Sequence, residues 1–276
     1  MKTLLCCIVK QKNLYLRDFV EYYKNIGFTN IVLYDNNGEN GEYPQQVIGD
    51  YIANGFAIYV DVRGKHRYQL EAYTECYNRY SNDYDWIAFF DVDEFLSIQS
   101  GKQIGELLSE EKYSDADVIH FYWMIYGDNG LVHYDGRPVY DRFLVPNKPL
   151  ADKNNYKIII RCENRMKYVF TDANSYRWRS EYGAIVVKNS RGDVITDKNP
   201  YTSFTYDNAY IKHYNTLTIE EFLYRRFGRR SYADMASSFN KDVVMKIFYD
   251  TNEMTAEKEE IVNDFFSKFE FETDNV

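Results

Sequence analysis

Three carboxylates interrupt a run of apolar and aromatic residues in the segment WIAFFDVDEFL, which spans residues 86–96. Asp91, Asp93 and Glu94 need a partner there, because a buried carboxylate without one is strongly destabilising. At the end of a strand the backbone leaves its extended course, so the side chains of Asp91 and Asp93 can converge on one point. Such oxygen ligands suit Mn²⁺ or Mg²⁺, and a cation held this way can stabilise charge on a departing diphosphate. The other interpretation is a turn whose acids cap the next helix.

Composition excludes several classes of protein. The net charge of -9 and the pI near 5.1 argue against general nucleic-acid binding, which needs a basic face. The four cysteines form neither a C-x-x-C pair nor a Cys/His cluster, so a structural zinc site is not expected. The sequence has no apolar run as long as a membrane helix, and its first residues do not resemble a signal peptide. We expect a cytoplasmic protein, with peripheral membrane contact left open.

The first 125 residues alternate between the periodicities of strands and helices. Continuous apolar runs predict buried strands, and apolar residues at a spacing of three or four predict helices between them. Strands separated by helices imply a mainly parallel, twisted sheet with flanking helices. The predicted strands are residues 3–9, 30–35, 56–62, 86–91 and 117–126, and the predicted helices lie around 16–26, 70–80 and 103–111.

The rest of the chain is predicted to add to this sheet. Residues 127–215 are less regular and predict an insertion with a small antiparallel extension, in which 157–161 and 184–188 are strand-like. Near residue 216 the chain becomes helical, and Thr218 with Glu221 forms a T-x-x-E capping box. Residues 255–271 predict an acidic amphipathic helix. We expect one α/β domain over residues 1–276.

Two acidic loops are expected at the same edge of the sheet. In open sheets of this type, ligands bind outside the carboxyl ends of the strands. Asp35, Asn36 and Asn37 follow one predicted strand, and Asp91 to Glu94 follow another. Both loops therefore lie where this fold class places its chemistry.

Four segments together resemble one family of enzymes. WIAFFDVDEFL and KQKNLYLRDFVEYYKNIGFTNIVLYDNN (10–37) are similar to the glycosyltransferase family 2 and family 92 group, which has the Rossmann-like GT-A fold. WMIYGDNG (123–130) and IKHYNTLTIEEFLYRRFG (211–228) resemble the same group, in the same order. The resemblance implies a nucleotide-sugar-binding half at 1–126, an acceptor-side region at 127–215 and C-terminal helices at 216–276. One departure is Leu217, where relatives often carry a basic residue.

The resemblance also implies roles for individual residues. Asp91 and Asp93 match the D-x-D motif that holds the metal and the nucleotide sugar, and Asp35 matches the acid that bonds the base. His213 matches a late histidine that completes the metal shell in many such enzymes. The implied ligands of Mn²⁺ or Mg²⁺ are Asp91, Asp93 and His213, and the implied contacts of the nucleotide sugar are Lys10, Asp35, Asn36, Asp91 and Asp93.

An inverting transfer also needs a base that takes the proton of the acceptor hydroxyl. Asp128, in the YGDNG loop, is the first candidate, with Glu181 and Asp135 as alternatives. Loop aspartates beside Asn and Gly also form turns, so a structural role is open for Asp128. Trp123 could stack on an acceptor sugar or pack in the core.

The predicted activity is a metal-dependent hexosyl transfer. The resemblance implies a UDP-linked donor, galactose or a related hexose, inversion, and a glycan or lipid-linked glycan acceptor. The first alternative is a phosphohydrolase of the haloacid-dehalogenase type, in which the first Asp of D-x-D is a nucleophile. Glu94 and the motif's position after the fourth predicted strand argue against it. The second alternative is a non-catalytic carbohydrate-binding protein.

Overall fold

The computed structural model describes five stretches of the chain: residues 1–147, 155–162, 185–196, 204–228 and 241–268. The chain divides into two compact units. The first comprises Met1–Met124 and Pro149–His213, and the second Ile125–Lys148 and Tyr214–Val276. Each unit is described by itself. Whether the whole chain acts as one domain stays a prediction.

The first unit is built around a sheet. Among the described residues it has nine strands in the order β3-β2-β1-β4-β7-β6-β9-β5, with β8 beside β6. The strands β3, β2, β1 and β4 run parallel, whereas β7 runs antiparallel to both β4 and β6. The strands are β1 (Thr3–Val9), β2 (Asn30–Asp35), β3 (Ala57–Asp61), β4 (Trp86–Phe89), β5 (Glu94–Ile98), β6 (Val118–Ile125), β7 (Tyr156–Arg161), β8 (Val187–Asn189) and β9 (Ala209–His213).

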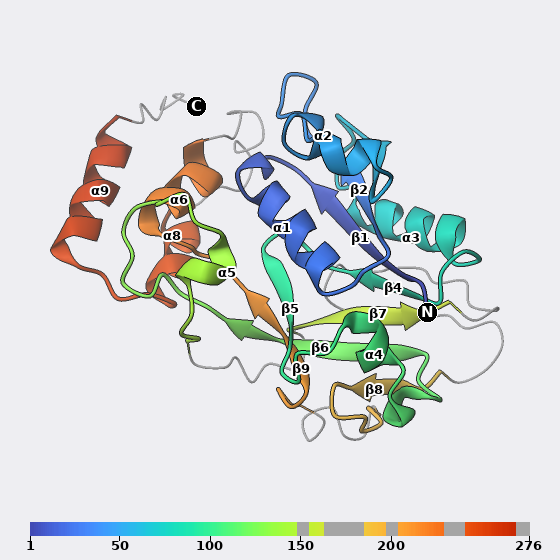
Figure 1. The fold of residues 1–276 in the computed structure, drawn as a ribbon. Helices are drawn as coiled ribbons and strands as arrows, with labels where there is room; N and C mark the ends of the chain where they lie inside the picture. The colour runs from blue at the N-terminus through green and yellow to red at the C-terminus, as the bar shows by residue number, and fades with distance from the viewer. Residues whose placement is uncertain (148–154, 163–184, 197–203, 229–240, 269–276) are drawn as a thin grey trace. The chain divides into compact units, whose positions relative to one another are not determined.

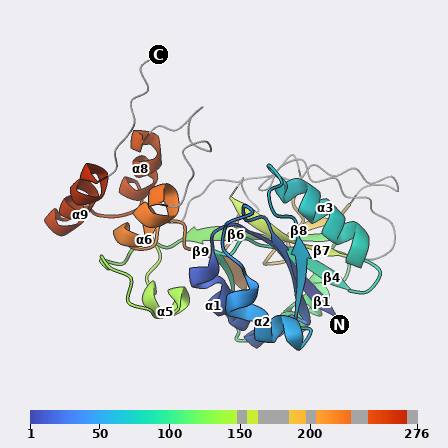
Figure 2. The ribbon, with the colours of Figure 1, turned by 90° about the horizontal axis from the view of Figure 1, so that it is seen from above.

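Helices cover both faces of the parallel strands. In Figure 2 the helices α1 and α2 lie on one side of these strands and α3 on the other. Alternate residues of β1 point to opposite faces, so Leu4 and Cys6 pack in the core on the α3 side, with Tyr73 and Cys76. The helices are α1 (Asn13–Asn25), α2 (Gln45–Ala53), α3 (Gln69–Tyr80) and α4 (Ile104–Leu108), followed by the 3₁₀ turn η1 (Glu111–Tyr113).

The second unit consists of short helices around a small apolar core. Ile219, Phe222, Met245 and Phe248 are buried in it. The predicted capping box is confirmed, because the Thr218 hydroxyl accepts a hydrogen bond from the Glu221 N–H. The helical elements are α5 (Val139–Arg142), α6 (Ile219–Leu223), the π-helical turn η2 (Tyr224–Gly228), α8 (Lys241–Tyr249) and α9 (Ala256–Ser267).

The predicted fold class is confirmed, with local corrections. Helix α2 was missed, and so was β5, which begins at Glu94, a residue predicted to lie in a loop. Strand β7 was predicted in an antiparallel extension; it does run antiparallel to its neighbours, but it lies inside the sheet between β4 and β6. Strand β8 pairs with β6 in parallel. The errors in the strands share a cause, because strand partners are chosen by long-range packing that a local sequence pattern does not encode.

Candidate functional site

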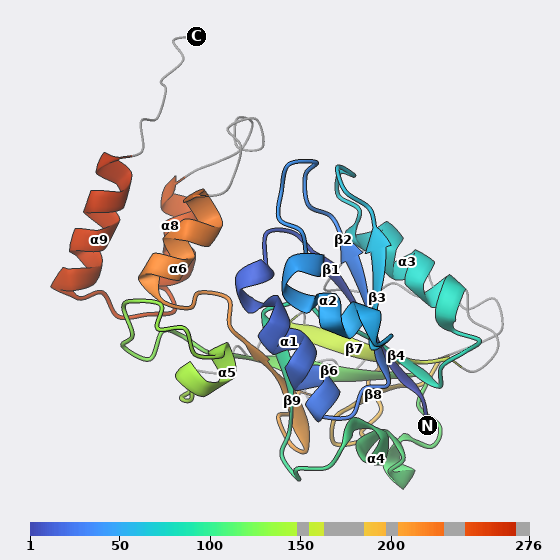
Figure 3. The ribbon, with the colours of Figure 1, turned by 45° about the horizontal axis from the view of Figure 1, so that its top comes forward.

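The site is positioned by strands that end at one edge of the sheet. Val9 and Asp35 are partners in the register of β1 and β2, so Lys10 and Asn36 follow side by side. Strand β4 runs in the same direction and ends just before the acidic motif. In Figure 3 the arrowheads of β2 and β3 point to this common edge. The predicted placement of both acidic loops at the carboxyl edge is therefore found.

Asp35 is fully buried and accepts hydrogen bonds from several protein donors. Its Oδ2 accepts from the Tyr59 hydroxyl and from Arg63 Nη1, both at 2.7 Å. Its Oδ1 accepts from the Asn37 side-chain amide at 2.6 Å. Burial and the hydrogen bond to Asp35 raise the pKa of Tyr59 to about 12. Both carboxylate oxygens of Asp35 are thus engaged by the protein.

Arg63 holds the loop between β2 and α2. Its Nη1 also donates to the Glu42 carbonyl at 2.8 Å, and its Nη2 donates to the Gly38 carbonyl at 2.7 Å. The guanidinium lies 4.2 Å from the centroid of the Tyr43 ring, within the range of a cation–π interaction. The planar fork of an arginine suits such divergent hydrogen bonds, which a lysine could not reproduce.

The same loop contacts the segment that follows β1. The Glu42 carboxylate accepts the N–H of Asn13 at 2.8 Å, at the start of α1, where a backbone N–H lacks a partner within the helix. Asn37 Oδ1 accepts the N–H of Gln11 at 2.7 Å. Between these two contacts lies Lys12, whose Nζ is 3.1 Å from Asp93 Oδ2. The loops after β1 and β2 therefore place a cation that pairs with Asp93.

Asp91 is surrounded by donors from two other elements. Its Oδ1 accepts hydrogen bonds from Gln69 Nε2 at 3.0 Å and the Tyr73 hydroxyl at 3.1 Å, both on α3. Its Oδ2 lies 2.7 Å from Lys157 Nζ, on β7. The Lys157 side chain is 0% exposed, whereas that of Asp91 is 32% exposed. Lys157 thus supports Asp91 from the interior of the unit.

Glu94 is separated from its two acidic neighbours by burial. It is fully buried, its Oε2 accepts the Asp91 N–H at 2.8 Å, and Lys157 Nζ lies 3.2 Å from the same oxygen. Burial raises the pKa of Glu94 well above its ordinary value, and Lys157 only partly opposes this shift. Glu94 therefore supports the motif from inside the fold, as a structural neighbour of Asp91.

His213 lies near this cluster through the pairing of β5 with β9. It is the register partner of Glu94, so the two side chains share one face of that antiparallel pair. Its ring centroid is 4.1 Å from that of Trp123, which places Trp123 beside the predicted ligand. Among the residues that the structure describes, no three or more His, Cys, Asp or Glu side chains are grouped to hold a metal ion.

The donor chemistry of the motif nevertheless suits a hard cation. Asp93 offers carboxylate oxygens, and its partner Lys12 is 22% exposed and sits on a loop. That lysine can be displaced at lower cost than the buried Lys157. Asp91 and Asp93 are the two partly exposed carboxylates of the motif, at 32% and 19%, and both could hold a divalent ion.

Two of the candidate bases, Asp128 and Asp135, lie in the second unit, and the third is outside the described residues. Asp128, in the second unit, is buried, and its Oδ2 lies 2.5 Å from the buried Lys258 Nζ. Asp135 is hydrogen-bonded to Arg137, which lowers the pKa of its carboxyl and makes it a weaker base. The geometry favours a structural role for Asp128, and its role as the base stays a prediction. Glu181 lies outside the described residues.

Sequence reasoning missed the cations that balance the acids. Lys12, Arg63 and Lys157 were assigned no role, although each pairs with a predicted site carboxylate. For Lys157 a signal existed. It precedes the apolar residues 158–160 in a predicted strand, where a buried lysine requires an acidic partner.

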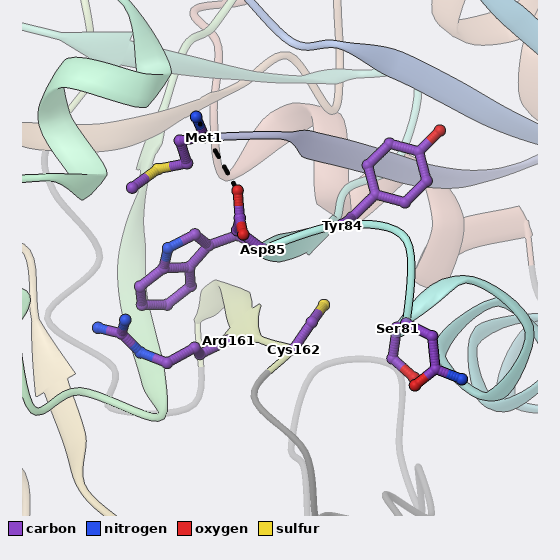
Figure 4. A pocket seen from close by; sticks show the side chains of 8 residues that line it. Met1, Ser81, Tyr84, Asp85, Arg161 and Cys162 are labelled. Carbon is purple, nitrogen blue, oxygen red and sulfur yellow. Dashed lines mark ion pairs between the residues drawn. The ribbon is translucent and has the colours of Figure 1, made fainter.

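A separate cavity lies at the other end of β4. Its volume is about 460 Å³, and it is lined by Asp85, Trp86 and Arg161, among others. Figure 4 shows Asp85 beside the amino terminus of Met1, with which it forms an ion pair. Trp86 is the first residue of β4, whereas the acidic motif follows its last residue. The cavity is therefore distinct from the carboxyl-edge site.

The structure also bears on membrane insertion and on the cysteines. In the part of the chain that the structure describes, no helix has both the length and the apolar character required to cross a membrane. Cys6, Cys7, Cys76 and Cys162 are buried free thiols.

Solved structures with some similarity include two of S. aureus TarS. The structure of TarS 1-349 is 11% identical, with a TM-score of 0.44, and the match covers 96% of this chain and 71% of that one. The complex of TarS 1-349 with UDP is 12% identical, with a TM-score of 0.35, and the match covers 49% of this chain and 38% of that one. TM-scores of this size do not establish a shared fold.

Sequence comparisons give a clearer result. A glycosyltransferase family 92 protein of Ricinus communis is 26% identical over 137 residues, which are 49% of this chain and 24% of that protein. One of Oryza sativa subsp. japonica is 22% identical over 104 residues, 38% of this chain and 18% of that protein. The matches thus span a quarter or less of these relatives. The model of the family described as glycosyltransferase family 92 matches residues 2–218, most of the chain, and this chain therefore belongs to glycosyltransferase family 92.

Proposed function

We propose that this chain is a glycosyltransferase that moves a hexose from a nucleotide sugar to a hydroxyl group of a glycan or lipid-linked glycan. Family membership over residues 2–218 is the observation that carries the proposal. A UDP-linked donor, galactose as the hexose and inversion at the anomeric carbon are proposed on family grounds. The proposal includes a cytoplasmic location, with peripheral membrane contact where the acceptor is lipid-linked.

The proposed donor site uses the carboxyl edge of the parallel strands. Asp93 and Asp91, with His213 nearby, would hold Mn²⁺ or Mg²⁺, and this ion supplies positive charge against the departing diphosphate. Lys10 is exposed directly after β1 and is proposed to contact the same phosphates. The loop residue Asn36 is proposed to contact the nucleotide.

Asp35 has a more indirect part in this proposal. Its carboxylate oxygens accept hydrogen bonds from Tyr59, Arg63 and Asn37. We therefore propose that Asp35 acts on the nucleotide base mainly by holding the loop that follows it. The base that removes the acceptor proton is proposed to be Asp128 or Glu181.

The two alternative functions make different demands on the motif. In a phosphohydrolase, Asp91 would have to attack phosphorus, although its oxygens accept hydrogen bonds from Gln69, Tyr73 and Lys157. Such bonds stabilise the carboxylate and lower its nucleophilicity. A non-catalytic carbohydrate-binding protein would bind sugars without releasing nucleotide.

One experiment separates the three functions. The intact chain is incubated with a panel of sugar nucleotides and Mn²⁺, and thermal stabilisation and nucleotide release are measured. We expect a UDP-sugar to stabilise the protein and to release UDP when an acceptor is present, and Asp93→Asn to abolish both effects. Asp50→Asn, which removes an exposed acid on α2, is the control and should behave as wild type. Hydrolysis of a simple phosphate ester without any response to nucleotides would reject the proposal.

A further inference from the structure

Trp123 lies near the end of β6, at the edge of the sheet where the acidic motif is found. Strand β6 runs antiparallel to β7, which runs antiparallel to β4, so β6 and β4 share a direction. The backbone N–H of Trp123 donates to the Asn155 carbonyl at 2.9 Å, and its carbonyl accepts from the Tyr206 hydroxyl at 2.8 Å. The backbone of Trp123 is therefore fixed at the carboxyl edge from both sides.

Among the residues that the structure describes, the indole N–H of Trp123 is a buried hydrogen-bond donor with no acceptor. Native proteins pair nearly all of their buried donors, because an unpaired one is destabilising. The Trp123 side chain as a whole is only half-buried, so a ligand can approach it from solvent. The position therefore needs an acceptor that the described residues do not supply.

A second unsatisfied atom lies in the same neighbourhood. Lys157 Nζ lies 5.9 Å from the centroid of the Trp123 ring and 3.2 Å from Glu94 Oε2. The other oxygen of that carboxyl, Oε1, is buried and has no hydrogen-bond partner in the described part of the chain. A donor and an acceptor thus remain unsatisfied around one lysine. Hydroxyl groups, of a ligand or of bound water, supply both complementary functions.

The surroundings of Trp123 favour a neutral, ring-shaped ligand over an anion. Lys157, the nearby cation, is already paired with Asp91 at 2.7 Å, so its charge is balanced by acid. The Trp123 ring lies 4.1 Å from the ring of His213, and the two together form an aromatic wall. Aromatic walls with a few placed polar groups are typical of sites for small ligands. A pyranose fits this wall, because its C–H face packs on a ring and its hydroxyl oxygens accept hydrogen bonds.

We infer that Trp123 is a specificity-determining residue that receives a pyranose ring, with its indole N–H donating to a hydroxyl oxygen of that sugar. The inference rests on the proposed function and extends it from the diphosphate to the sugar. Lys157 lies near Trp123 and pairs with Asp91, so the sugar site adjoins the proposed diphosphate site. The sugar is either the hexose of the donor or a sugar of the acceptor, and the test separates these two sources.

The first measurement follows the indole N–H groups by ¹H–¹⁵N NMR of the intact, tryptophan-labelled chain in buffer with Mg²⁺. The chain has three tryptophans, Trp86, Trp123 and Trp178, and variants with phenylalanine assign their signals. We expect UDP-galactose to shift the indole proton of Trp123 downfield, because a new hydrogen bond forms, and UDP alone to shift it much less. Trp86 is the internal control, because it is 1% exposed at the other end of β4, so its signal should not move.

Binding affinities supply a second measurement. Trp123→Phe keeps an aromatic ring and removes the N–H, so the dissociation constant of UDP-galactose should rise about fivefold, the effect of one lost hydrogen bond. That of UDP should be unchanged, which also shows that the variant is folded. Trp123→Leu removes the ring as well and should weaken UDP-galactose by at least about tenfold. Trp86→Phe makes the same chemical change in the core and should alter neither constant.

Methyl β-galactoside and methyl β-glucoside, added to the chain saturated with UDP, distinguish a sugar of the acceptor from that of the donor. If a methyl glycoside shifts the Trp123 signal and UDP-galactose shifts it no more than UDP does, the ring binds the acceptor, and the inference holds. If UDP and UDP-galactose shift the signal equally and no methyl glycoside shifts it, Trp123 contacts the nucleotide, and the inference is overturned. A signal that none of these compounds moves belongs to an N–H bonded to water only, which overturns it too.

The proposed function and this inference fail in different ways. If no nucleotide binds, the proposed donor site is wrong, and the methyl glycosides still test Trp123 on the nucleotide-free chain. If wild type and Trp123→Phe turn over UDP-galactose with the same KM for donor and acceptor, the inference is wrong while the proposed function stands. If Trp123→Phe does not fold, Trp86→Phe and Trp178→Phe identify two of the three signals and leave the third to Trp123.

Discussion

The contact between Arg63 and Asp35 offers a quantitative test of how the donor edge is held together. Arg63→Met keeps most of the aliphatic volume and removes the guanidinium. The hydrogen bonds lost include those to Asp35 Oδ2 at 2.7 Å, to the Glu42 carbonyl at 2.8 Å and to the Gly38 carbonyl at 2.7 Å. The Asp35 side chain is 0% exposed, so its charge loses a partner away from water.

The expected cost follows from this burial. Breaking one side of a buried ion pair costs about 3–5 kcal/mol. Arg63 is 11% exposed and Asp35 keeps hydrogen bonds from Tyr59 and Asn37, so we expect the lower end, about 3 kcal/mol. In a chain of this size that corresponds to a fall in melting temperature of roughly 6–12 °C.

The free energy of unfolding of the first unit is measured by urea denaturation, monitored by circular dichroism. The binding of a UDP-sugar is measured on the same variants. Arg17→Met is a matched control, because Arg17 also pairs with an aspartate through two hydrogen bonds of 2.9 Å. That pair is 50% and 55% exposed, so its loss should change stability very little. If Arg63→Met and Arg17→Met proved equally mild, the view that Arg63 organises this edge would be wrong.

Three further predictions concern stability and the base. Arg142→Met should lower the free energy of unfolding of the second unit by about 3–5 kcal/mol, measured by urea denaturation, because the Arg142 side chain is 0% exposed and pairs with Glu221 at 2.7 Å. Since the pKa of Tyr59 is raised to about 12, stability should fall between about pH 10 and 12 as the unfolded chain loses this proton first; a Tyr59→Phe variant with the same alkaline loss as wild type would contradict this. Asp128→Asn should destabilise the protein through the buried Lys258; turnover per folded molecule equal to that of wild type would remove Asp128 as a candidate base and leave Glu181, whereas lost turnover would support Asp128.

The placement of the acidic loops could be predicted, and the reason is physical. Periodicity is a short-range property, so alternating strands and helices can be recognised from consecutive residues. Parallel strands have their carboxyl ends at the same edge of the sheet. Asp35 ends one such strand and Asp91 follows another, so both must lie at that edge. The D-x-D pair and its family resemblance could therefore be predicted from the sequence alone.

The assignment of Glu94 shows where this reasoning stops. In the sequence it is one of three adjacent acids, and it was predicted to lie in a loop. In the structure it begins β5 and is fully buried, because β5 pairs with β9, more than a hundred residues later in the chain. Local patterns do not reveal such a partner.

The sequence by itself determined the family, the parallel half of the sheet and the edge at which Asp91 and Asp93 lie. Only the tertiary structure decided which charges meet there, because Lys157 comes from a strand 66 residues beyond Asp91 and reaches it through the antiparallel register of β7 on β4. The energy of an ion pair depends on distance and burial, and both are set when remote strands pack. The different partners of Asp91 and Asp93 are therefore a property of the fold.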